Sequence, residues 1–119
     1  MTKLTIAQRL ETRPGATPVA VLPSAGDVMV ECVPELERAI DDALSGGARH
    51  LVLDLAGLDF IDSASVGALL HLQQRRTQAG GRLLLCSLRP SFQRLVEASG
   101  LGGTFTMARD VPAALALLR

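Results

Sequence analysis

The residues best suited to chemistry are Asp62 and Ser63, within the stretch LDFIDSASVGALL at positions 58–70. A strand-like run ends at this pair, and an apolar helix is expected to begin at once. The first amides of a helix lack partners within the helix, and the helix dipole favours negative charge there. Two interpretations follow. Either Asp62 or Ser63 is the N-cap, worth about 1 kcal/mol, or the Ser63 hydroxyl accepts a phosphate that these amides stabilise.

A phosphate on Ser63 would change the charge of its surroundings. It would add roughly two negative charges to a surface that already holds Asp59 and Asp62. A partner docked on that surface would be repelled, so the modification would break a complex without unfolding the domain.

Small residues follow the pair on the expected helix. Gly67 costs about 1 kcal/mol relative to alanine in a helix interior, which indicates close approach of another backbone, from within the fold or from a partner. Leu72 is either an exposed docking residue or part of a wide core face. The sequence therefore predicts a partner-binding surface made of Asp59, Asp62, Ser63, Ala64, Ser65, Gly67, Ala68 and Leu72.

Alternating strands and helices are expected to position this surface. The patterns predict strands over 4–11, 18–22, 50–55, 82–88 and 104–108, and helices over 33–45, 63–79, 89–101 and 110–119. A turn at TRPGAT would join the first two strands into a hairpin, and Pro23 would end the second strand or lie on its edge. Strands that alternate with helices predict one α/β domain over residues 1–119 with a mostly parallel sheet.

Signals for helix ends support these ranges. Pro34 suits a first helical turn, and Gly46-Gly47 closes that helix. In the helix after Ser63, the inner face is expected to comprise Val66, Leu69, Leu70, Gln73 and Thr77. Gly100 is expected to cap the third helix with Leu101 packed back on it, and Asp110 to be the N-cap of the last helix.

Composition narrows the class of protein. The chain has 119 residues, 48% of them hydrophobic, with three Phe and neither Trp nor Tyr, so its core must be aliphatic. A formal net charge of zero argues against a broad nucleic-acid surface. No apolar run approaches the roughly 18 residues of a membrane span, and a cytoplasmic protein is expected. Cys32 and Cys86 lack metal spacing and are expected to be buried thiols, with a redox sensor as the alternative.

An enzymatic role for Ser63 would require a base. His71 lies eight residues further along the helix, or about 12 Å along its axis, and His50 precedes a strand. No GxSxG elbow, phosphate-binding glycine loop or metal cluster is present. We therefore expect no catalytic residue, no metal and no cofactor.

Two stretches together, LVLDLAGLDFIDSASVGALL and GGRLLLCSLRPSFQRLVEASGL, resemble the STAS domain of bacterial anti-sigma factor antagonists. The Asp-Ser junction, the Gly-Gly pair and the late SGL fall at the family's spacing. The resemblance extends from about residue 19 onward and is strongest over 50–101. It implies a mixed sheet of four or five strands with about four packed helices, and a switch without enzymatic activity.

The resemblance also implies how the switch works. The serine after the aspartate, Ser63 here, is phosphorylated by a partner kinase, which is itself an anti-sigma factor with an ATP-binding fold of the histidine-kinase type. The unphosphorylated antagonist binds the kinase and frees the sigma factor. Phosphorylation releases the antagonist, and a phosphatase resets it.

The sequence departs from the family pattern near this site. Ser65 and Val66 stand where the family has glycine and leucine, and the Ser65 hydroxyl is expected about 200° around the helix from Ser63, so Ser63 remains the expected acceptor. Met29 replaces the family's aspartate after the second strand, which leaves Asp27 as the nearby acid expected to contact the partner. The alternatives are a regulator that is not phosphorylated and a soluble STAS subunit of a lipid-exporter type of transporter.

Overall fold

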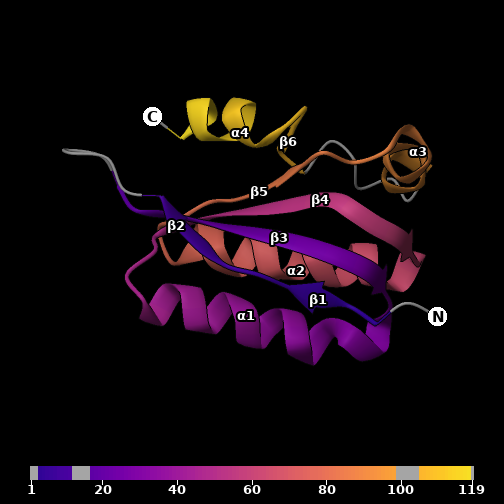
Figure 1. The fold of residues 1–119 in the computed structure, drawn as a ribbon, viewed down its shortest axis with the longest axis horizontal. Coiled ribbons are helices and arrows are strands. Elements are labelled where there is room, and N and C mark those ends of the chain that lie inside the picture. Colours follow the sequence, from indigo (N-terminus) through magenta and orange to yellow (C-terminus); the bar gives the residue numbers. More distant parts are fainter. Residues whose placement is uncertain (1–2, 12–16, 99–104, 119) are drawn as a thin grey trace.

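Six strands and four α-helices make up the part of the chain that the structure, a computed structural model, describes, namely residues 3–11, 17–98 and 105–118 (Figure 1). The strands are β1 (Thr5–Ile6), β2 (Arg9–Glu11), β3 (Val19–Val28), β4 (His50–Ile61), β5 (Leu83–Cys86) and β6 (Met107–Ala108). The helices are α1 (Val33–Ser45), α2 (Ser63–Gln78), α3 (Pro90–Ala98) and α4 (Val111–Leu117), with a short 3-10 helix η1 (Val30–Cys32) before α1.

The sheet is mixed, as predicted. Strands β1 and β2 both pair antiparallel with β3, and β3, β4, β5 and β6 follow one another in parallel. The first predicted strand is therefore two short strands that pair one after the other along β3, β1 with Ser24 and Ala25 and β2 with residues 19–21. The predicted turn at 12–16 lies outside the described residues, as do the predicted cap Gly100 and Leu101.

The prediction that Pro23 ends the second strand or lies on its edge is wrong. Pro23 lies inside β3, opposite Asp54 of β4, and its carbonyl accepts a hydrogen bond of 2.9 Å from the amide of Ala7. The ladder shifts register directly after it, because Ala25 pairs with Gly57. β4 thus fits an extra residue where the proline offers no amide, and the strand continues across the irregularity.

Helices cover both faces of the sheet. Figure 1 shows α1 and α2 side by side below the sheet and α4 above it. The larger core lies under α1, α2 and α3, and a smaller one, made of Val19, Val21, Val52, Leu84, Cys86 and Ala114, lies under α4. Both cores are aliphatic apart from Phe105 in the larger one and Cys86 in the smaller one. Each fully buried leucine or valine stabilises the fold by roughly 1.5–3 kcal/mol.

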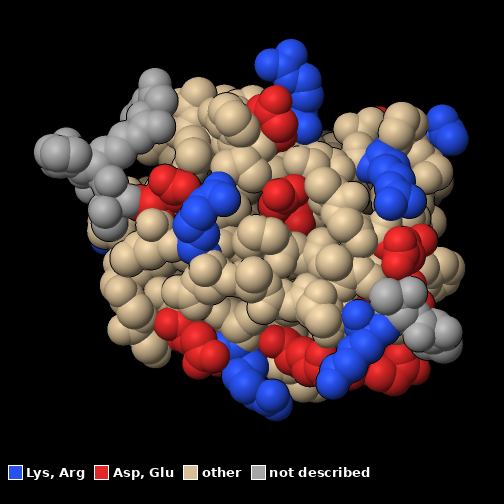
Figure 2. Space-filling view, in the orientation of Figure 1, with Lys and Arg blue, Asp and Glu red and all other residues tan. Residues whose placement is uncertain are grey.

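Charges of both signs are interspersed on the surface. On the face drawn in Figure 2, basic and acidic side chains alternate along the lower margin, over α1, without gathering into a field of one sign. This agrees with the formal net charge of zero. Within residues 3–11, 17–98 and 105–118, no helix has both the length and the hydrophobicity that a bilayer crossing requires.

Candidate functional site

The start of α2 lies where the carboxyl ends of two parallel strands meet. Ile61, the last residue of β4, pairs with Val28, the last residue of β3. One residue later, the amide of Asp62 donates a hydrogen bond of 3.3 Å to the carbonyl of Val28. β4 continues to Ile61, six residues beyond its predicted end, so the strand delivers the chain directly to α2. Functional groups in open α/β sheets collect at such ends.

Asp62 is the N-cap of α2. Its backbone is extended, with φ −95° and ψ 165°, and its Oδ1 accepts a hydrogen bond of 2.8 Å from the amide of Ser65. Burial alone would raise the pKa of the Asp62 carboxyl, but hydrogen bonds from the Ser65 hydroxyl and from the amides of Ser65 and Val30 outweigh it. The pKa of Asp62 is therefore below its usual value. Of the two interpretations of the pair, the cap belongs to Asp62, which leaves the Ser63 hydroxyl available for another role.

Ser63 is the first helical residue of α2 and its side chain is exposed. Its place in the first turn keeps the hydroxyl beside amides that have no partner inside the helix. A negatively charged group on this oxygen would meet both the amides and the positive end of the helix dipole.

Ser65, two residues further, is placed differently. Only 1% of it is exposed, and its hydroxyl lies 2.5 Å from Asp62 Oδ1 and 3.2 Å from the carbonyl oxygen of Val28. The expectation that Ser65 belongs to a partner-binding surface is therefore wrong, because its side chain faces the fold. The separation from Ser63 that helical geometry predicted is confirmed.

Leu72 also belongs to the core. It is 6% exposed and packs within the larger cluster, so the wide core face is the correct interpretation and the docking role predicted for Leu72 is wrong. The inner face of α2 is rotated accordingly. Val66 and Leu69 are buried as predicted, whereas Thr77 is exposed. The physical reason is that α1 packs beside α2 and covers the side on which Leu72 projects.

Gly67 does not make a tight contact inside the fold. The residue is exposed, and a Cβ added to it would meet nothing within 4 Å. Of the two reasons expected for this glycine, close approach inside the fold is excluded, and approach of a partner remains. Gly67 is four residues from Ser63 and three from Ala64, spacings that place all three on one side of α2.

The remaining predicted contacts differ in exposure. Asp59 and Ala64 are exposed and Ala68 is half-buried. Asp27, near the end of β3, is only 9% exposed and pairs in register with Phe60, so it offers little surface to a partner.

Two exposed apolar residues near the start of α2 were not predicted from the sequence. Phe60 is 46% exposed at the end of β4, and Val30 is 50% exposed in η1, just after β3. Successive side chains of a strand point to opposite faces. Because Ile61 is buried, its neighbour Phe60 could have been predicted to face outward. We call the exposed residues Val30, Asp59, Phe60, Ser63, Ala64 and Gly67 the α2-start surface.

The histidines lie far from an arrangement that could activate Ser63. His50 begins β4, whose 12 residues separate it from the α2-start surface by roughly 35 Å, and its Nδ1 accepts a hydrogen bond of 3.0 Å from the amide of Arg82. Burial, followed by the charges of Arg49 and Arg82, lowers the pKa of His50. His71 is exposed on α2. Among the described residues, no three His, Cys, Asp or Glu side chains could together hold a metal ion.

The cysteines are placed largely as expected. Cys86 is fully buried in β5, and this burial raises the pKa of its thiol. Cys32 is half-buried before α1, with its sulfur 3.7 Å from the carbonyl oxygen of Asp27.

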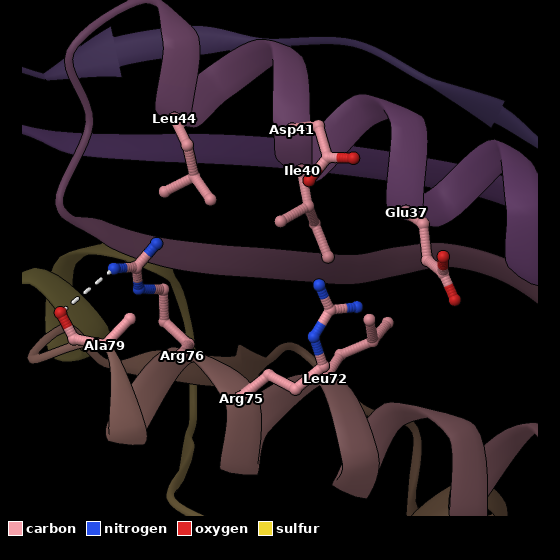
Figure 3. A pocket seen from close by; sticks show the side chains of 8 residues that line it. All are labelled: Glu37, Ile40, Asp41, Leu44, Leu72, Arg75, Arg76 and Ala79. Carbon is pink, nitrogen blue, oxygen red and sulfur yellow. Dashed lines mark hydrogen bonds between the residues drawn. The ribbon is translucent and has the colours of Figure 1, made fainter.

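A small hollow lies away from this site, between α1 and α2. Figure 3 shows its walls, which are Glu37, Ile40, Asp41 and Leu44 from α1 and Leu72, Arg75, Arg76 and Ala79 from α2. Its volume is about 120 Å³. The nearest of these α2 residues, Leu72, is nine positions from Ser63, or about 13 Å along the helix axis, so the hollow is separate from the α2-start surface.

Comparison with known proteins agrees with the fold of this chain. The family model described as the STAS domain matches residues 8–114. BtrV of Bordetella bronchiseptica, described as a candidate anti-sigma factor antagonist, is 34% identical over 85 residues, which cover 71% of this chain and 73% of BtrV. An anti-sigma factor antagonist structure from Mycobacterium paratuberculosis has a TM-score of 0.75 at 24% identity and covers 97% of this chain and 95% of its own. The unphosphorylated form of the antagonist SpoIIAA has a TM-score of 0.67 at 22% identity, with coverage of 93% and 96%.

Proposed function

The chain belongs to the STAS domain family of anti-sigma factor antagonists, and on that premise we propose that Ser63 is the phosphoacceptor of a protein-binding switch. The observation that carries the proposal is the division of roles at the start of α2. Asp62 caps the helix, Ser65 is buried, and Ser63 is the exposed hydroxyl between them.

The unmodified α2-start surface suits a protein partner. Phe60 and Val30 supply exposed apolar area, which is released from water on binding. Gly67 leaves room on the outside of α2 for a partner backbone. The partner is an anti-sigma factor that is also a serine kinase with an ATP-binding fold of the histidine-kinase type, and binding the antagonist occupies it and frees its sigma factor.

Phosphorylation reverses the binding. The kinase transfers the γ-phosphoryl group of ATP to the Ser63 oxygen, ADP leaves, and the hydroxyl proton is released. The product carries about two negative charges near Asp59 and Asp62. The first-turn amides stabilise them in the free protein, whereas a docked partner would have to remove their water. A phosphatase that directs water to the phosphorus restores the hydroxyl and releases inorganic phosphate.

The test is to incubate the protein with ATP and candidate ATP-binding anti-sigma factors, then measure intact mass and map the modified residue. We expect one phosphoryl group on Ser63, and we expect Ser63→Ala to bind the kinase without being released. Ser91→Ala is the matched control, because Ser91 is another exposed serine in the first turn of a helix, α3. Stoichiometric phosphorylation of the Ser63→Ala variant would refute the assignment.

Partner identity separates this function from the transporter alternative. Co-purification from the native cytoplasm should recover an ATP-binding anti-sigma factor. Recovery of a transporter ATPase instead would contradict the proposal.

A further inference from the structure

We propose that Ser65 is the positioning residue of this switch: its buried hydroxyl joins the Asp62 carboxylate to the end of β3 and so fixes the first turn of α2, from which Ser63 projects. The geometry of this inference rests on the hydrogen bonds of Ser65. Its consequence for phosphorylation of Ser63 rests on the proposed function.

The geometry distinguishes Ser65 from an ordinary helical serine. Its amide donates to Asp62 Oδ1 at 2.8 Å, and its hydroxyl lies 2.5 Å from the same oxygen and 3.2 Å from the Val28 carbonyl. The hydroxyl has a single proton, which the two acceptors share in a three-centre hydrogen bond. One side chain therefore connects the cap of α2 with a strand that is 37 residues away in sequence.

A second connection runs through Asp62. The Asp62 amide donates to the carbonyl of Val28 at 3.3 Å, and the short helix η1 begins two residues after Val28. Val30 belongs to η1 and is half exposed. The start of α2 and the segment after β3 are therefore held together. Val30 and the α2 residues of the α2-start surface keep fixed positions relative to each other when a partner binds.

Burial makes these hydrogen bonds consequential. With 1% of Ser65 exposed, water cannot readily replace its hydroxyl, so an Asp62 oxygen that loses it loses a charge-assisted donor. A residue without a hydroxyl at position 65 would leave the cap with its amide donors alone. Ser63 would then project from a less constrained turn, and a kinase that needs the serine oxygen in line with its ATP would work more slowly.

The first test needs no kinase. In Ser65→Ala, carboxyl NMR titration should show the pKa of Asp62 moving up toward its ordinary value of 3.8. The Asp62 amide, which donates to the Val28 carbonyl, should exchange with solvent at least tenfold faster. The amide of Ala113, which is held by the Asp110 cap of α4, should exchange at the wild-type rate. This difference between the two helix starts separates a positioning role from a general loss of stability, which would speed amide exchange equally at the start of α2 and at the start of α4.

A second variant covers the case in which the alanine protein does not fold. Ser65→Cys keeps nearly the same volume and has only a weak donor, so the changes in the Asp62 carboxyl pKa and in the exchange rate of the Asp62 amide should have the same sign as in Ser65→Ala. If both quantities stay at wild-type values in whichever variant folds, or if the exchange rate of the Ala113 amide changes as much as that of the Asp62 amide, Ser65 is not a positioning residue.

The last step measures phosphorylation by the kinase identified for the wild-type protein. Ser65→Ala should reduce kcat for Ser63 about tenfold with little change in KM, and the modified residue should still be Ser63. If the wild-type protein is never phosphorylated, the proposed function fails while the titration and exchange results still decide the role of Ser65. In the wild-type protein, a phosphoryl group mapped to Ser65 instead of Ser63 would overturn the inference.

Discussion

The helices α2 and α4 both begin just after a strand, at an aspartate with an extended backbone. Asp62 and Asp110 each accept a hydrogen bond from the amide three residues further on, at 2.8 Å from Ser65 and 2.9 Å from Ala113. Judged by the cap alone, the two starts are equivalent, and each cap is worth about 1 kcal/mol.

The residues after each cap distinguish the start of α2 from the start of α4. The first helical residue is an exposed serine in α2 and a half-buried valine, Val111, in α4, where it packs against the smaller core. The third helical residue is Ser65 in α2, whose hydroxyl contacts the Val28 carbonyl of β3. In α4 it is Ala113, which has no hydroxyl. An N-cap therefore specifies where a helix begins, while a candidate site needs an exposed reactive group at the first position and a tertiary contact that orients it.

The largest difference is expected when a carboxylate is placed at the second helical position of each helix. Ala64 and Pro112 occupy that position and both are exposed. Ala64→Glu should weaken binding to the anti-sigma factor at least a hundredfold, about 2.7 kcal/mol, because the charge enters the α2-start surface. Pro112→Glu should bind as the wild type does. Titration calorimetry measures both affinities.

Both variants should fold, because an acidic residue in the first turn is favoured by the helix dipole. Equal losses of affinity would show that the partner does not distinguish the two helix starts, and the α2-start surface would not be its docking site.

Local chemistry made much of this comparison predictable from sequence. The cap at Asp110 and the start of α2 at Ser63 were predicted correctly, and the cap of α2 was narrowed to Asp62 or Ser63, of which the structure has Asp62. These features depend on residues within one turn of each other. The alternation of strands and helices was predictable for the same reason, since the period of the apolar residues is local.

Contacts between distant segments were not predictable in this way. The burial of Ser65 depends on the Val28 carbonyl, which a different strand supplies, and the burial of Leu72 depends on how α1 packs beside α2. β4 runs past residue 55 because two register shifts against β3 interrupt its alternation without ending the ladder. Each of these errors depended on a contact with a segment that is distant in the sequence.

A smaller difference is expected when each cap is removed. Asp110→Ala should lower the free energy of unfolding by about 1 kcal/mol. Asp62→Ala should lower it by about 2 kcal/mol, because the buried Ser65 hydroxyl also loses its charged acceptor. Denaturant unfolding of the two variants measures the difference. Equal losses would mean that the additional hydrogen bonds of Asp62 contribute nothing to stability.

Gly67 provides a test in which stability and binding should change in opposite directions. Because an added Cβ would meet nothing within 4 Å, Gly67→Ala should stabilise the protein by up to about 1 kcal/mol and weaken binding to the anti-sigma factor. The counterpart in α4 is Ala116→Gly at an exposed position, which should cost about 1 kcal/mol and leave binding unchanged. Undiminished affinity in Gly67→Ala would mean that no partner approaches that side of α2.

The smallest effect is expected from pH, and it concerns Asp62 alone. Burial opposes the ionised form, yet the hydrogen bonds from Ser65 and Val30 outweigh it, so the pKa of the folded carboxyl lies below the ordinary 3.8. A depressed folded pKa contributes stability that is fully present above the unfolded pKa and is lost as the pH falls through the folded value. The free energy of unfolding should therefore fall below about pH 4 more steeply in the wild type than in Asp62→Asn, which keeps an acceptor but cannot titrate. Parallel curves for the two proteins between pH 7 and pH 3 would show that these hydrogen bonds do not favour the ionised carboxylate. The start of α2 would then resemble that of α4 in its cap as well as in its backbone.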